Sequence, residues 1–127
     1  MDSGSIVQCM GSLSRITYMI AMPDEIRGWC YSDPIVRQGP LEFVSAQGSW
    51  GRDAETGELV VHLHGFVIDS EGKTNGGHFV SGASRVLATC EVGLLSGAGV
   101  AIRRRFDPAL GMPVLMAAPL ACAECAP

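Results

Sequence analysis

The stretch LVVHLHGFVIDSEGKTNGGHFV, residues 59–80, predicts a β-hairpin. Residues 59–68 are rich in valine, leucine and phenylalanine and form the longest strand candidate of the chain. Residues 69–73 are polar and include a glycine, which is typical of a turn. Residues 76–80 then resume an apolar pattern, so we expect the two segments to pair as antiparallel strands.

This hairpin carries all three histidines of the chain, His62, His64 and His78. His62 and His64 are two positions apart, so on a strand both side chains share one face. If the loop is centred near Glu71, His64 lies opposite His78 with Cβ atoms about 5 Å apart. Gly76 and Gly77, just before His78, permit close backbone approach or a bulge.

Three converging neutral imidazoles predict a divalent metal site. They would leave a coordination position for water or substrate, as in catalytic zinc sites. Zinc is the first candidate, and nickel, iron and manganese also accept imidazole ligands. The competing interpretation is that the His-x-His spacing arises by chance and that these are ordinary half-buried histidines.

The rest of the chain consists of short apolar runs separated by turn residues, with no 3.6-residue periodicity sustained over three turns. Residues 24–39 look like a long irregular connection that could form a lid or pocket wall. We expect one domain, a mainly antiparallel β-sheet of the β or α+β class. Further strands are expected at residues 6–10, 14–21, 41–47, 86–95, 100–105 and 112–116.

The length and the net charge of the chain limit which classes of function are compatible with the sequence. The 127 residues suggest a single domain with its core over about residues 6–115. The net charge of −4 disfavours direct DNA binding and attachment to an anionic membrane. No apolar run is long enough to span a membrane, and the start lacks the charge pattern of a signal peptide, so we expect a cytoplasmic protein.

The five cysteines are odd in number and scattered, so a disulfide framework is not expected. Cys122 and Cys125 form a Cys-x-x-Cys pair in the Ala/Pro-rich tail, residues 117–127. We expect this tail to be poorly ordered, with a redox or metal role as the less favoured interpretation.

Several other side chains are candidates for a site around the histidines. Arg103 and Arg105 would share one face of a strand, as an anion clamp or as a solvated edge. Glu91 and Glu42 are candidate general bases or ordinary surface charges. Candidate substrate-binding residues, each with an ordinary structural interpretation as well, are Ser12, Trp29, Tyr31 and Arg105.

The histidine segment resembles the PPC domain (plants and prokaryotes conserved). The similar features are His62-Leu-His64, the polar turn 69–72, Gly76-Gly77-His78 and Glu91-Val92, in that order. Supporting similarities over residues 6–115 are Gly11-Ser12-Leu13, the segment 39–44, the segment 104–107 and Gly111. Relative to the family pattern, we expect one strand and one helix at the start to be missing or replaced, and residues 24–39 to be longer.

The resemblance implies an α+β fold around an antiparallel sheet, assembled as a homotrimer. It also implies that His62, His64 and His78 hold a metal, often zinc, near a subunit interface. In plants the domain follows AT-hook motifs, which are absent from this sequence, and prokaryotic members are usually free-standing and often described as DNA-binding.

Two functions follow as expectations. The first is a metal-dependent enzyme of lyase, hydratase, isomerase or hydrolase type that acts on a small anionic molecule. In it an arginine would hold the anion, and Glu91 or Glu42 would move protons. The second is a non-enzymatic, DNA-associated regulatory or assembly module with a structural metal. A metal or ligand sensor is a third interpretation.

Overall fold

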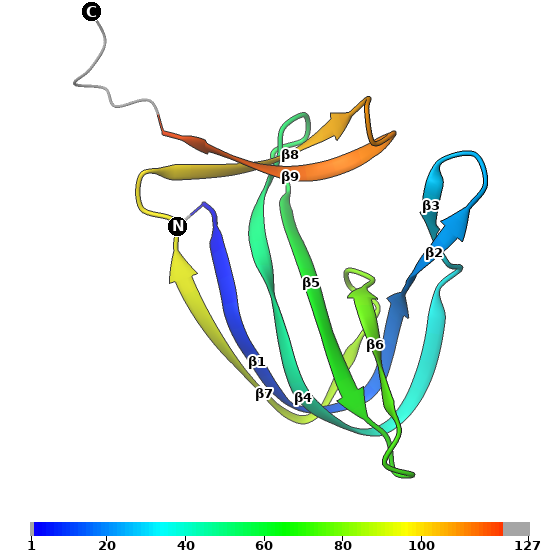
Figure 1. Cartoon of the computed structure of the whole chain (residues 1–127). Coiled ribbons are helices and arrows are strands. Elements are labelled where there is room, and N and C mark those ends of the chain that lie inside the picture. Colours follow the sequence, from blue (N-terminus) through cyan, green and yellow to red (C-terminus); the bar gives the residue numbers. More distant parts are fainter. Residues whose placement is uncertain (1, 121–127) are drawn as a thin grey trace, which may run out of the picture.

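The computed structural model describes residues 2–120, and every regular element in that range is a β-strand (Figure 1). The helical part of the expected α+β class is therefore missing from these residues, in line with the lack of any sustained 3.6-residue period. No described segment forms a helix that could cross a membrane. The strands are β1 (Gly4–Met19), β2 (Ala21–Asp24), β3 (Gly28–Tyr31), β4 (Ile35–Asp53), β5 (Leu59–Ile68), β6 (Thr74–Phe79), β7 (Arg85–Ser96), β8 (Val100–Asp107) and β9 (Met112–Pro119).

Two of the expected boundaries are wrong. Residues 6–10 and 14–21 were expected as two strands, but β1 runs through Gly11 without a break. A Cβ at Gly11 would lie 2.1 Å from the Thr89 carbonyl oxygen, so this glycine lets β1 pass close to β7 rather than end. Residues 24–39 are also not an irregular connection, because they contain most of the β2–β3 hairpin and the start of β4.

The main sheet closes on itself. Its strand order is β7-β1-β6-β5-β4-β8-β9, and β1 also pairs with β4. The antiparallel pairs β1–β4, β4–β5, β5–β6 and β6–β1 therefore form a closed circuit. The β8–β9 hairpin joins β4 through a short parallel pairing and crosses one end of the curved sheet (Figure 1).

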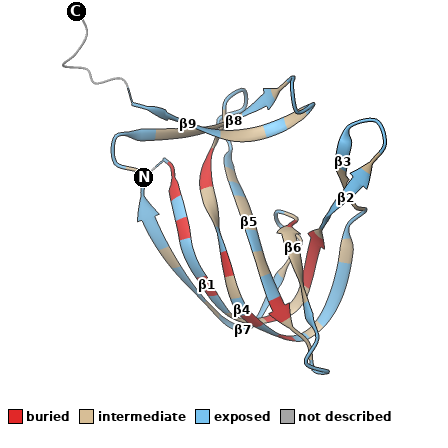
Figure 2. Ribbon diagram, viewed as in Figure 1, coloured by how far each residue is buried: buried red, intermediate tan, exposed pale blue. Residues whose placement is uncertain are grey.

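The core lies inside this curved sheet, where Figure 2 shows buried positions on β1, β4 and β5. Ile16, Leu41 and Val67 are its largest fully buried side chains. β7 differs, because all but two of its residues are exposed. Its exposed apolar side chains are Val86, Leu87, Val92, Leu94 and Leu95.

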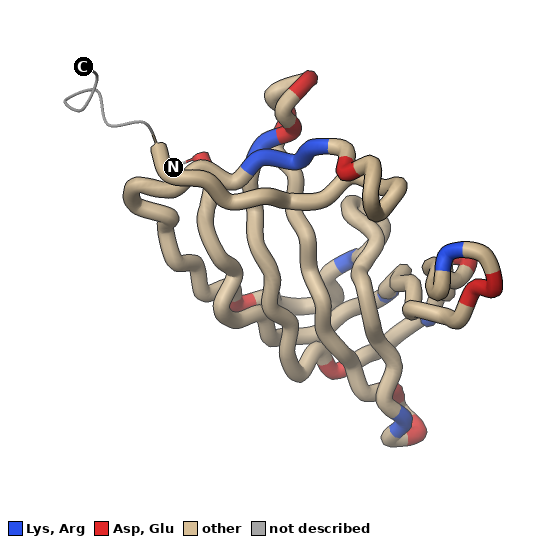
Figure 3. The backbone as a smooth tube through the Cα atoms, turned by 45° about the horizontal axis from the view of Figure 1, so that its top comes forward, with Lys and Arg blue, Asp and Glu red and all other residues tan. Residues whose placement is uncertain are grey.

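Charged residues gather at turns and on β8, while the walls of the sheet are largely uncharged (Figure 3). Of the expected tail, residues 117–119 form the end of β9. Cys122 and Cys125 lie outside the described residues. Cys9, Cys30 and Cys90 are free thiols, and burial raises the pKa of Cys9.

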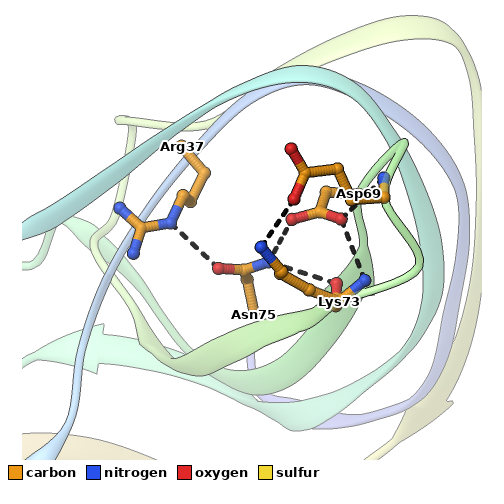
Figure 4. A network of polar contacts seen from close by, with 5 residues as sticks. Arg37, Asp69, Lys73 and Asn75 are labelled. Atoms are coloured by element: carbon orange, nitrogen blue, oxygen red, sulfur yellow. Dashed lines mark hydrogen bonds and ion pairs between the residues drawn. The ribbon is translucent and has the colours of Figure 1, made fainter.

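The β5–β6 hairpin has the register that the sequence predicts, with His64 paired to His78. The Asp69 Oδ1 atom accepts hydrogen bonds from the backbone amides of Glu71 and Lys73, which closes the turn. Asn75 then links this turn to β4 (Figure 4), because it donates to Asp69 Oδ2 and accepts from the Nε atom of Arg37. The turn therefore fixes which residues of β5 and β6 face each other.

Candidate metal centre

The three imidazoles lie against one another on a partly exposed face of β5 and β6. The ring centroids are 4.8 Å apart for His62 and His64, 4.8 Å for His62 and His78, and 5.0 Å for His64 and His78. One ring nitrogen from each residue can be chosen so that all three lie within 4.8 Å of one another. The convergence expected from the spacing is therefore present.

Local sequence explains this convergence. Period-two alternation on β5 points His62 and His64 the same way, and the hairpin register places His78 beside His64. Two glycines let β6 approach its neighbours on both sides. A Cβ at Gly76 would lie 2.2 Å from the Gly65 carbonyl oxygen, and one at Gly77 would lie 2.4 Å from that of Met19.

The donor set fits a divalent metal. The His78 Nδ1 and His64 Nε2 atoms are 3.2 Å apart. Two nitrogens that each lie about 2.1 Å from one ion would be separated by roughly 3.0–3.4 Å at octahedral or tetrahedral angles. Burial, and then the neighbouring histidines, lowers the pKa of both His62 and His78, so the neutral form that binds a metal is favoured.

Two of the histidines, His62 and His78, line a cavity of about 550 Å³. Tyr31 reaches it from the β2–β3 hairpin, and its hydroxyl lies 3.5 Å from His78 Nδ1. The β8–β9 hairpin forms the opposite wall. The lining residues are Met19, Tyr31, Ser49, Val60, Val61, His62, His78, Phe79, Ser81, Arg104, Met112, Pro113, Val114 and Leu115.

Of the substrate-binding residues expected from sequence, Tyr31 lines this cavity. Trp29 packs edge-on against Tyr31, with ring centroids 5.3 Å apart, but lines a neighbouring hollow between the β2–β3 hairpin and the β8–β9 turn. Arg103 and Arg105 do not line the histidine cavity. Arg103 donates to the Ile102 carbonyl, and by alternation its side chain starts on the opposite face of β8 from that of Arg104. The exposed Arg105 lines a separate hollow together with Asp53 and Arg104.

Three further candidates also lie away from the cavity. Glu91 is exposed on β7, which pairs with β1 at the edge of the sheet and not with β5. Glu42 is exposed and pairs with Ile68, at the end of β5 remote from His62. Ser12 accepts a hydrogen bond from the Ala88 backbone amide at 3.2 Å, which is a structural contact between β1 and β7.

Arg104 is the lining residue that sequence reasoning missed. Alternation does place it on the opposite face of β8 from Arg103 and Arg105. This alternation identifies Arg104 as a cavity residue only once it is known that β8 crosses the end of the sheet near the histidines.

Solved structures share this fold. A proposed DNA-binding protein from Bacteroides thetaiotaomicron is 20% identical with a TM-score of 0.68 over 91% of this chain and 74% of its own. A metal-containing protein from Archaeoglobus fulgidus is 21% identical with a TM-score of 0.66 over 91% and 75%. A plant- and prokaryote-conserved (PPC) protein from Pyrococcus horikoshii is 22% identical with a TM-score of 0.63 over 94% and 76%.

Curated relatives match over a small part of their length. Two proteins named bifunctional protein GlmU, from two Synechococcus strains, are each 31% identical, over 87% and 100% of this chain. The chain spans only 16% and 18% of those proteins. The Plants and Prokaryotes Conserved (PCC) domain model matches residues 1–97, which include the whole histidine hairpin. With that match over most of its length, and with the fold and the histidine cluster described above, the chain belongs to the Plants and Prokaryotes Conserved domain family.

Proposed function

We propose that the protein binds a divalent metal, zinc first, through His62, His64 and His78 and acts as a metal-dependent enzyme. Its substrate would be a small anionic molecule, and the reaction would be of lyase, hydratase, isomerase or hydrolase type. The observation that carries the proposal is a cluster of three imidazoles beside a cavity large enough for a small molecule. When bound, the metal supplies a Lewis acid and lowers the pKa of a coordinated water.

The residues of the chain itself would bind and orient the substrate. The apolar side of the cavity, including Val60, Phe79 and Leu115, would exclude water from the substrate. The hydroxyl of Tyr31 is the group best placed to hold or move a proton beside His78. Glu91 and Glu42 could reach a site of this kind only from a neighbouring subunit.

We also propose that the chain forms a homotrimer. β7 is an edge strand with exposed apolar side chains, and association is one way to cover such an edge. Sedimentation should therefore give a mass three times the 13.4 kDa of one chain. A monomer at micromolar concentration would contradict the trimer without affecting the metal proposal.

X-ray absorption of the zinc-loaded protein tests whether the site is of the catalytic kind. We expect three imidazole nitrogens and one oxygen from water, because the described residues within reach of the cluster supply three metal-ligating side chains. Four ligands from protein would instead indicate a structural metal and would count against an enzyme.

A DNA-associated module remains the second candidate, because the Bacteroides thetaiotaomicron relative has that proposed role. The net charge of −4 and the exposed, mostly uncharged walls of the sheet favour the small-molecule function. Clear retardation of random duplex DNA by the isolated chain at low salt would reverse this preference.

A further inference from the structure

Arg104 occupies a position that distinguishes it from its two arginine neighbours. It lies on β8 opposite Asp53 in the parallel β4–β8 pairing, and its Nε atom donates to Asp53 Oδ2 at 2.8 Å. Unlike Arg103 and Arg105, it lines the cavity that contains His62 and His78. β8 lies beyond residues 1–97, so the family match assigns no role to it.

Asp53 holds this arginine from outside the cavity. Its Oδ1 atom accepts hydrogen bonds from the backbone amides of Glu55 and Thr56, both at 3.0 Å. These bonds and the Arg104 contact lower the pKa of Asp53 to about 2, so the carboxylate stays charged at neutral pH. Asp53 itself does not line the histidine cavity.

The guanidinium keeps donors for a ligand. Within residues 2–120, the contact to Asp53 uses Nε, and no hydrogen bond from either Nη atom of Arg104 is formed. The side chain is 42% exposed although its partner Asp53 is only 13% exposed. An anchored arginine with a free edge can bind a carboxylate through two parallel hydrogen bonds.

The other residues that line the cavity indicate which kind of anion it would bind. Among the described residues no aspartate or glutamate lines the cavity, and Arg104 is its one arginine or lysine. The other lining groups include hydroxyls, such as Ser49 and Tyr31, and aliphatic or aromatic side chains, such as Val114 and Phe79. One partly neutralised cation beside an apolar wall suits a monocarboxylate better than a phosphate dianion, which loses more hydration when it leaves water.

We propose that Arg104 is the anion-binding residue of this cavity and that the ligand is a small carboxylate with an apolar body. Its carboxylate lies on the Arg104 guanidinium, and its other end lies toward His62 and His78. The placement of the ligand's other end at the histidines rests on the proposed metal function, whereas the contact between its carboxylate and Arg104 does not depend on that function.

The test is a titration of the whole chain followed by NMR chemical shifts, with hexanoate as the probe and hexan-1-ol as its uncharged analogue. It is run on zinc-loaded and on zinc-free protein, with zinc content measured in each variant. We expect hexanoate to bind about tenfold more tightly than hexan-1-ol, because a charged pair adds to the same apolar contact. Arg104→Gln should remove that difference and leave hexan-1-ol binding unchanged.

Two neighbours supply matched controls. Arg103→Gln and Arg105→Gln remove the same charge one position away, and both should bind hexanoate like the wild type. Arg104→Lys keeps the charge without the paired donors, so it should show an intermediate affinity, and it serves if Arg104→Gln fails to fold.

Three outcomes would overturn the proposal: unchanged hexanoate binding by the folded Arg104 variant, an equal loss in Arg105→Gln, or tighter binding of inorganic phosphate than of hexanoate. A protein that binds hexanoate through Arg104 but takes up no zinc would refute the metal function and keep this inference. A protein that takes up zinc but binds hexanoate independently of Arg104 would refute this inference and keep the metal function.

Discussion

Replacing His78 with alanine should lower zinc affinity at least about a hundredfold, because the substitution removes one of three ligands. Loss of a group that merely supports a metal ligand already costs about 10–100-fold. The chain has three histidines and all of them belong to the cluster, so no further histidine can replace His78. Elemental analysis of purified protein and a competitive zinc titration measure the effect, and His62→Ala should behave in the same way.

Ser49→Ala is the matched control for this result. Ser49 pairs with His62 across β4 and β5 and lines the same cavity, but it offers no nitrogen ligand. Its zinc content should equal that of the wild type. Because His78 is only half-buried, its alanine variant should keep the wild-type circular dichroism spectrum. Full zinc occupancy in folded His78→Ala protein would refute the three-histidine site.

The second large effect is expected at Gly48, where β4 and β5 are pressed together next to the site. A Cβ at this position would lie 1.9 Å from the carbonyl oxygen of His62 and 2.9 Å from its carbonyl carbon. Both are backbone atoms, so Gly48→Ala must separate the two strands. We expect a loss of about 3 kcal/mol in the free energy of unfolding, measured by urea denaturation. Zinc affinity should also fall about tenfold or more, because misplaced ligands bind less well.

Gly93→Ala separates this contact from the general effect of placing alanine at a strand glycine. At Gly93 the nearest atom to an added Cβ is the Gln8 Cβ at 3.3 Å, a contact that a movement of a few tenths of an ångström relieves. The Gly93 variant should lose much less stability and should retain its zinc. If the urea concentration at which Gly48→Ala unfolds equals that of the wild type, β4 and β5 do not approach each other closely at Gly48.

The part of the site that lies on one hairpin could be predicted from the sequence. Alternation set the common face of His62 and His64, and the turn centred on Glu71 set the pairing of His64 with His78. Both are short-range properties of the backbone. The sheet class and the boundaries of β7 followed from the same local signals.

The positions of the candidate residues outside the hairpin could not be predicted from the sequence, because they depend on pairing between strands that are far apart in the chain. Nothing local shows that β1 pairs with β4, β6 and β7, or that this arrangement places Ser12 and Glu91 away from β5. The β2–β3 hairpin could not be recognised in the sequence because it lies in a stretch that contains glycines and prolines. In the structure this hairpin places Tyr31 beside His78.

The sequence by itself determined a β domain and three histidines on one face of a hairpin, because a period of two and a polar turn act over a few residues. Only the tertiary structure decided which arginine lines the cavity beside two of them, His62 and His78. Alternation could place Arg104 on the opposite face of its strand from Arg103 and Arg105, but it could not say which face would meet the histidines. That choice was made by the pairing of β8 with β4, between residues about fifty positions apart, where burial and loop closure rather than local preference set the register.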